Sequence, residues 1–174
     1  PATGDKLSAA FFAAIDKDAI KGLTAAQFKS MSKEAVGALT VEQVPNLKKE
    51  LLAALSQDQA KALTGDQLAV LTKEQTQAIK VERLADMTTS DQLTKLNVAD
   101  LTNKQVASLS AAQITALGDD QIANFTKEQI SAISDQGLTA GIKGLTAGQV
   151  GKLSPDQVSG ITAKQMTAIA SVVT

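Results

Sequence analysis

Residues 101–132 read LTNKQVAS LSAAQITA LGDDQIAN FTKEQISA, four consecutive eight-residue segments built on one pattern. We call each segment an octad and number its places from one to eight. Places one and six hold large apolar residues, place five holds Gln, and place two usually holds Thr or Ser. About twenty such octads fill most of the 174-residue chain. Tandem repetition is typical of architectures in which each unit packs against its neighbours along the chain.

Places two and five have the spacing of a capping box, in which a Ser or Thr and a Gln three residues later bond to each other's main-chain N–H groups. If Thr40 is an N-cap, Leu39 precedes the helix and Val44 is its fourth residue, so places one and six form a hydrophobic staple. Acids recur at the second helical position, as at Glu74, where they face the positive end of the helix dipole. Each octad is therefore predicted to start a new short helix.

This pattern assigns structural roles to named residues. We expect the repeat core to contain Leu39, Leu63, Leu71, Leu109, Leu117, Phe125, Leu153 and Ile161. We expect helix caps at Thr40, Thr64, Thr72, Thr126, Ser154 and Thr162. The column of glutamines could form a hydrogen-bonded ladder along one side, although capping its own helix is the simpler role for each.

A single long helix does not fit this pattern. At about 100° per residue, successive first-place residues would precess by about 80° and spread around the cylinder. A strand does not fit either, because places one and six would face opposite sides of a sheet. The chain should turn at every octad or every second one.

Helices of six or seven residues are far shorter than the roughly 12 to 15 residues needed for independent stability, so their neighbours must hold them. We therefore expect an all-α solenoid, a tightly coiled superhelix with one very short α-helix per octad, as a single repeat domain over residues 1–174. Two octads per superhelical turn and three are both compatible with the spacing. Ala or Gly at places seven and eight, as at Gly151 and Gly160, would permit close backbone approach.

The pattern breaks in three stretches. Residues 45–55, PNLKKELLAAL, have Lys48 where a cap is expected, which predicts that two octads fuse into one longer helix. Near 87–101 the register changes, and Leu101 is interpreted as both the sixth place of one octad and the first of the next. Near 133–145 the register changes again among clustered glycines, which predicts a joint or an extended loop.

Composition excludes several classes of function. The chain has no Cys and no His, which removes thiolate nucleophiles, the usual imidazole base and nearly every transition-metal site. Its 17 basic and 18 acidic residues, net charge -1, give no footprint for nucleic acid. No apolar run approaches the roughly 20 residues of a membrane span. We expect no catalytic, cofactor-binding or metal-binding residues, no cofactor, no membrane insertion and no small-molecule substrate.

Two local motifs admit a functional interpretation. Residues 16–22, DKDAIKG, begin like an EF-hand loop, but Ile20 and Lys21 stand where the third ligand and the turn glycine belong, so a helix cap is favoured. Regular threonines suggest an ice-binding surface, but their hydroxyls are needed at helix N-termini.

The octads LTKEQTQA, LTNKQVAS, LSAAQITA, FTKEQISA and LSPDQVSG resemble the short helical LTxxQ repeats of long tandem arrays in large bacterial surface and secreted, adhesin-like proteins. The resemblance covers nearly the whole chain. It implies a non-enzymatic structural, spacer or adhesin-like module at the cell surface or outside the cell, with no catalytic residues. The alternative is a scaffold that binds a protein partner, or a second copy of itself, along one face.

A second likeness concerns residues 153–162, LSPDQVSGIT, which look like the first helix of the DNA-reading repeats of transcription activator-like effectors. Those repeats have a much longer period, a glycine-rich specificity loop and a basic phosphate-facing stripe, all of which this sequence lacks. We interpret the likeness as a shared capping pattern.

Overall fold

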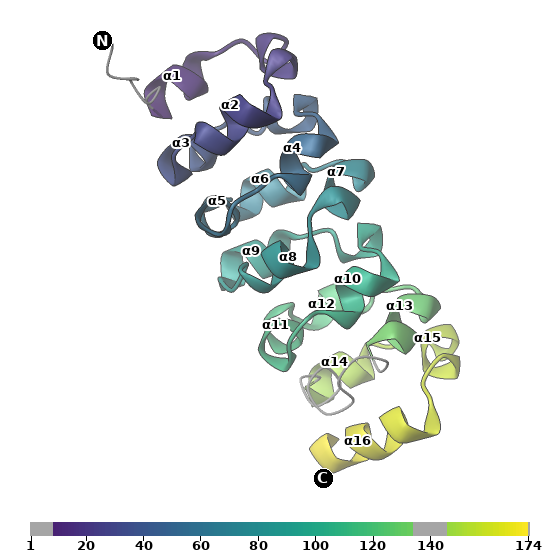
Figure 1. Ribbon diagram of the computed structural model, residues 1–174. Coiled ribbons are helices and arrows are strands. Elements are labelled where there is room, and N and C mark those ends of the chain that lie inside the picture. Colours follow the sequence, from purple (N-terminus) through teal and green to yellow (C-terminus); the bar gives the residue numbers. More distant parts are fainter. Residues whose placement is uncertain (1–8, 134–145, 174) are drawn as a thin grey trace. The chain divides into compact units, whose positions relative to one another are not determined.

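The computed structural model describes residues 9–133 and 146–173, and within them every regular element is a helix (Figure 1). The chain divides into two compact units, Pro1–Met87 and Thr88–Thr174. The boundary falls where the first predicted register change begins. The single repeat domain expected over residues 1–174 stays a prediction.

Unit 1 consists of very short helices separated by one or a few residues. In chain order they are α1 Ala9–Ala14, η1 Ala19–Gly22, α2 Ala25–Ser30, α3 Lys33–Gly37, η2 Val44–Asn46, α4 Lys49–Ala53, α5 Gln57–Ala62, α6 Gly65–Ala69, α7 Lys73–Ala78 and α8 Val81–Ala85, where η marks 3-10 helices.

Unit 2 is built in the same way. Its helices are α9 Ser90–Lys95, η3 Val98–Asp100, α10 Asn103–Ala107, α11 Ala111–Ala116, α12 Asp119–Ile122, α13 Lys127–Ala132, α14 Ala147–Gly151, α15 Pro155–Ser159 and α16 Ala163–Val173. Among the described residues, the α-helices before α16 have four to six residues. Of these described helices, α16 alone, with eleven residues, continues past a first place, at Ile169, where the pattern predicts an end.

The helices are short because the chain leaves the helical conformation at the first place of many octads, although first-place Leu117 and Ile133 keep helical backbones with ψ angles of -22° and -23°. Met31, Leu63 and Ile79 follow α2, α5 and α7 and have extended or near-extended backbones, with ψ angles of 138°, 131° and 124°. The next residue is a cap that also has an extended backbone, such as Ser32, Thr64 or Lys80. Two consecutive non-helical residues break the helix and start the next one.

Helices three octads apart pack against each other within each unit. In unit 1, α4 contacts α7, α3 contacts α5 and α5 contacts α8; in unit 2, α10 contacts α13. Each of these pairs joins helices that begin at the same place of their octads, as Lys49 of α4 and Lys73 of α7 do. Neighbours in space are therefore not neighbours in sequence.

First- and sixth-place side chains form the core. Among the residues expected there, Leu39, Leu63, Leu71, Leu109, Leu117 and Phe125 are buried, whereas Leu153 and Ile161 are half-buried. Sixth-place residues such as Phe28, Val36 and Ile114 are fully buried. The core is thin and mainly aliphatic, because each short helix contributes only one or two large side chains.

The prediction of one fused helix over residues 45–55 is wrong. The chain forms η2, passes through Leu47 in an extended conformation and begins α4 after Lys48, which takes the N-cap position without a side-chain hydrogen bond. The main-chain carbonyls of Val44 and Leu47 accept hydrogen bonds from Gln75, which a continuous helix would have used internally. Long-range hydrogen bonds thus override the local helical spacing.

The interpretation of Leu101 as a shared sixth and first place is also wrong. Val98, in η3, is fully buried and has the sixth-place role, while Leu101 is only the first place of the next octad. The segment from Leu96 to Asp100 is therefore a shortened octad. The glycine-rich stretch was expected to form a joint or a loop. From residue 134 to residue 145 it lies outside the part of the chain that the structure describes.

Close backbone approach occurs at some small residues. A Cβ atom added to Gly160 would lie 2.9 Å from the Lys127 carbonyl oxygen, as the sequence predicts, but one added to Gly151 would meet nothing within 4 Å. The expectation for Gly151 is therefore wrong. Gly37 also requires the absence of a side chain, because its added Cβ would lie 2.9 Å from the Ala62 carbonyl oxygen.

Candidate functional site

The recurring polar feature of the molecule is the pair formed by a cap and a fifth-place glutamine. In α7, the Gln75 main-chain N–H donates to Thr72 Oγ1 at 3.2 Å, and the Thr72 N–H donates to Gln75 Oε1 at 2.9 Å. Complete capping boxes of this kind begin α2, α5, α6, α7, α10, α11, α13, α14 and α15.

Each cap expected from the sequence takes part in such hydrogen bonds. Thr64, Thr72, Thr126 and Ser154 begin α-helices with complete capping boxes. Thr162 exchanges the same two hydrogen bonds with Gln165 just before α16. Thr40 exchanges them with Gln43, but the residues that follow form a turn and then η2 instead of an α-helix.

The same glutamines also hold distant parts of each unit together. Gln75 Nε2 donates to the carbonyl oxygens of Val44 at 2.9 Å and Leu47 at 2.7 Å. In octad terms, these acceptors are the sixth place four octads earlier and the first place that follows it. We call this pair of long-range hydrogen bonds a glutamine tie. The tie joins the first turn of one helix to the end of an earlier one.

Glutamine ties recur in both units. Gln59 reaches Phe28 O and Met31 O, Gln67 reaches Val36 O and Leu39 O, and Gln129 reaches Val98 O and Leu101 O. All have sequence separations of 31 and 28 residues. The regular acceptor pair shows that the contact is a property of the octad.

The ties follow the count of repeats and not the count of residues. Gln149 donates to Ile114 O at 3.0 Å and Gln165 to Ile130 O at 3.2 Å, both over 35 residues, and their second acceptors are the seventh-place carbonyls of Thr115 and Ser131. The extra four residues match the twelve-residue spacing from Ile133 to Leu145. The sixth-place acceptor is thus kept across the change in register, whereas of these three glutamines Gln157 alone also keeps the first-place acceptor, with bonds to Ile122 O and Phe125 O.

Burial makes these hydrogen bonds important. The tying glutamines are at most 4% exposed, so their amides have exchanged water for protein partners. The amide oxygen serves the cap and the amide nitrogen serves the earlier carbonyls, which uses both ends of the group. A carboxylate in the same position would provide acceptors only and would repel the carbonyl oxygens.

The sequence analysis favoured the capping role for these glutamines, with a hydrogen-bonded glutamine ladder as the alternative, and missed the tie to earlier main-chain carbonyls. A signal for it exists in the sequence. A capping box accepts Glu as readily as Gln at its last position, yet the fifth place of the octad holds Gln again and again and never Glu. Preference for the neutral amide indicates that its N–H groups have acceptors of their own.

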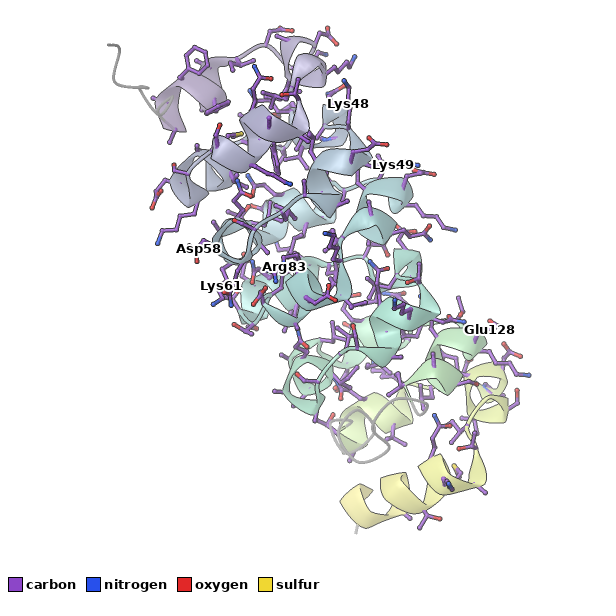
Figure 2. All side chains as sticks on the ribbon, viewed as in Figure 1. Lys48, Lys49, Asp58, Lys61, Arg83 and Glu128 are labelled. Atoms are coloured by element: carbon purple, nitrogen blue, oxygen red, sulfur yellow. The ribbon has the colours of Figure 1, made fainter. Side chains whose placement is uncertain are left out.

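One octad of unit 1 replaces the glutamine with an ion pair. Arg83, at the fifth place in α8, lies 2.9 Å from Asp86, which also accepts a hydrogen bond at 2.8 Å from Gln57 of α5. Figure 2 shows Arg83 on the same side of unit 1 as Asp58 and Lys61 of α5. This group joins α5 to α8, the helix three octads later, and has a structural role.

The EF-hand-like stretch makes local contacts only. Asp16 accepts a hydrogen bond from the Asp18 N–H at 2.7 Å, and Asp18 pairs with Lys21 at 2.6 Å. The Lys21 hydrogen bond and charge lower the pKa of Asp18. Any stabilisation from this exposed pair is present above the ordinary pKa of aspartate and is lost as the pH falls through the lowered value. Within the described residues, no three candidate metal-ligating side chains gather.

Comparisons with known proteins identify no relative: no protein-family model matches the chain, and no curated protein matches it. Among the residues that the structure describes, no helix combines the length and apolar character needed to cross a membrane.

Proposed function

We propose that this chain is a non-enzymatic structural repeat module, a spacer or adhesin-like segment of a surface or secreted protein. The observation that carries the proposal is the glutamine tie. Side chains that repeat along the sequence, namely the caps, glutamines and apolar residues, are used to hold helices in place. Their regularity is explained by structure without a substrate.

The proposed architecture within each unit is a superhelical coil. Helices pack against helices three octads away, and glutamine ties reach four octads back. These two kinds of contact favour a superhelical turn of between three and four octads over a superhelical turn of two octads. Because a coil of this kind grows by adding octads, its length follows the number of repeats.

Several further observations support a role other than catalysis. Acidic residues recur at the second helical position, where the helix dipole explains them, and the chain has neither Cys nor His. Residues Glu74 and Asp156 illustrate the position in units 1 and 2. The likeness of the octads to LTxxQ arrays favours a surface or extracellular location.

The spacer proposal is tested by changing the number of repeats. The three octads of residues 55–78 would be duplicated once in one variant of the full chain and twice in another. Small-angle X-ray scattering would then measure the maximum dimension of each variant. We expect equal increments in length with each duplication. A maximum dimension that grows with roughly the cube root of chain length, as it does for a compact domain, would contradict the proposal. The proposed surface or extracellular location is tested by fractionating the native cells. Finding the chain only in the cytoplasm would contradict that location.

A second candidate function is a scaffold that binds a protein partner. The observation that favours it is an open hollow of about 360 Å³ between α4 and α7, lined by Lys49, Glu50, Ala53, Glu74, Gln77 and Ala78. The hollow combines the small side chains of Ala53 and Ala78 with charged Lys49, Glu50 and Glu74, a lining that suits a polar side chain of a partner protein. Affinity capture from native cells, compared between the wild-type chain and Ala53→Glu, tests this candidate; equal capture or none would contradict it.

A further inference from the structure

Residues 124–126 of unit 2 carry a motif that the octad pattern does not explain. They read Asn-Phe-Thr, an Asn followed two residues later by Thr with no Pro between them. In exported proteins this tripeptide is the acceptor sequence for N-linked sugar. Asn124 holds the eighth place of its octad, which belongs neither to the cap nor to the tie. No other Asn of the sequence is followed two residues later by Ser or Thr.

The acceptor amide of this motif is accessible in the folded chain. Asn124 is exposed and lies in the turn between α12 and α13, where its main-chain N–H donates to Gln121 O at 3.0 Å. Among the described residues, no group accepts a hydrogen bond from its side-chain Nδ2. Asn97 differs, because its Nδ2 donates to Asp100 Oδ2 at 2.7 Å. The nitrogen that would carry a sugar is therefore free and faces solvent.

The hydroxyl of the motif is accessible as well. Thr126 is exposed, while Phe125 between it and Asn124 is buried and anchors the tripeptide in the core. Thr126 Oγ1 accepts a hydrogen bond from the Gln129 N–H at 3.2 Å. Within the part of the chain that the structure describes, its O–H donates to no protein atom, unlike the Thr102 O–H, which donates to a glutamine oxygen at 3.0 Å. Thr126 can therefore cap α13 and still offer a hydrogen to a transferase.

The surface beside Asn124 has room for a sugar. Asn124 borders an open hollow of about 290 Å³ whose lining includes Thr94 of α9 together with Gly118, Asp119 and Asp120. Gly118 has no side chain, and an added Cβ there would meet nothing within 4 Å. Carboxylates accept hydrogen bonds from hydroxyl groups. A sugar attached to Asn124 thus has space and hydrogen-bond acceptors next to it.

We propose that Asn124 is an N-glycosylation site. The substrate is a sugar activated as a glycosyl diphosphate, and a glycosyltransferase of the native cell catalyses the transfer. A bond forms between Asn124 Nδ2 and the anomeric carbon, and the bond from that carbon to the phosphate oxygen breaks. The diphosphate leaves with the electron pair, and the amide loses one proton to a base of the transferase. The inference rests on the proposed surface or extracellular location, because this modification belongs to exported proteins.

The test uses the full chain isolated from its native cells. No Lys or Arg lies between residues 105 and 126, so trypsin releases residues 105–127 as one peptide, whose mass and fragments are measured by mass spectrometry. Asn124→Gln removes the acceptor, Thr126→Ala removes the hydroxyl and Thr126→Ser keeps it. Asn103→Gln is the matched control, since Asn103 is exposed and lies outside the motif. Circular dichroism checks that each variant folds.

We expect the peptide of wild type, Asn103→Gln and Thr126→Ser to be heavier by one or more sugar residues attached at Asn124. Asn124→Gln and Thr126→Ala should lose this modification. An unmodified wild-type peptide, or sugar retained in Thr126→Ala, would overturn the inference. The outcome is separable from the proposed function, because a chain found at the surface without sugar contradicts the glycosylation site and leaves the spacer proposal standing.

Discussion

At the scale of single residues, the protein depends on a neutral amide that bonds in two directions. Gln67 Oε1 accepts from the Thr64 N–H, while its Nε2 donates to Val36 O and Leu39 O. An amide provides both functions without a charge, so its burial costs less than that of a carboxylate. No other side chain of this length offers an acceptor and two donors.

Replacing the amide with a carboxylate should therefore be severe. We expect Gln67→Glu to lower the free energy of unfolding by about 3 to 5 kcal/mol at neutral pH, because a buried charge faces two carbonyl oxygens. Urea unfolding followed by circular dichroism measures the change. Gln77→Glu is the matched control, since Gln77 is exposed on α7 and its change should stay within about 0.5 kcal/mol. Equal losses in the two variants would contradict the role of the tie.

The Gln67→Glu variant should also respond to pH in a definite direction. Burial beside carbonyl oxygens should raise the folded-state pKa of the introduced carboxyl group above its unfolded value. The defect relative to wild type is then full above the raised pKa and shrinks as the pH falls, because the protonated acid regains a donor. Unfolding free energies of both chains between neutral and acidic pH test this; a defect that grows on acidification would exclude the mechanism.

Core packing should contribute more than a single cap. Leu117 is 1% exposed, and Leu117→Ala should cost about 2 to 4 kcal/mol because the removed side chain leaves a cavity. Thr126→Ala should cost about 1 kcal/mol through the lost cap on α13. Thermal and urea unfolding of both variants rank them. A cap that costs more than the leucine would show that the burial is misassigned.

At the scale of elements, the helices depend on close approach as well as on caps. Gly37 ends α3, and an added Cβ there would lie 2.9 Å from a main-chain oxygen of α5. Because this oxygen belongs to the main chain of α5, it cannot shift aside to relieve a clash as the end of a flexible side chain can. The contact links α3 to α5, the helix three octads later, and leaves room for no side chain.

Two glycine substitutions should therefore have opposite effects. Gly37→Ala should lower the free energy of unfolding by about 1 to 3 kcal/mol through overpacking. Gly22→Ala should raise it slightly or leave it unchanged, because no atom lies within 4 Å of its added Cβ and Ala restricts the unfolded chain. Unfolding curves of the two variants give the signs. A stabilising Gly37→Ala would exclude the close approach.

At the scale of the whole molecule, the octad is the unit that can be added or removed. Deleting residues 64–71 takes out one complete repeat and keeps the register, so each later helix keeps a cap, a staple and an earlier partner. Deleting only residues 64–67 removes a cap and a glutamine while shifting Leu68 out of its sixth place. We expect the first deletion to keep a single cooperative thermal transition and the second to lower its midpoint much further. Equal effects would show that the eight-residue register is unimportant.

The sequence predicted the local structure well because capping boxes and staples involve residues three to five apart. Caps such as Thr72 and the all-helical class follow from that short range. The sequence did not predict the ties, since Gln75 and Val44 are far apart in the chain and meet only through the packing of other helices. The mistaken fusion over residues 45–55 has the same origin: local spacing favours one helix, but the distant Gln75 amide holds the turn at Leu47.

The central claim is that one buried glutamine both caps its own helix and ties it to a segment four octads earlier. Nuclear Overhauser contacts from the Gln67 side-chain amide protons, together with their exchange rate with water, test it most directly. We predict contacts to the main chain at Val36 and Leu39, at which the Nε2–oxygen distances are 2.9 and 2.7 Å, and exchange much slower than for Gln77. Contacts confined to α6 and Thr64, with exchange as fast as for Gln77, would contradict it.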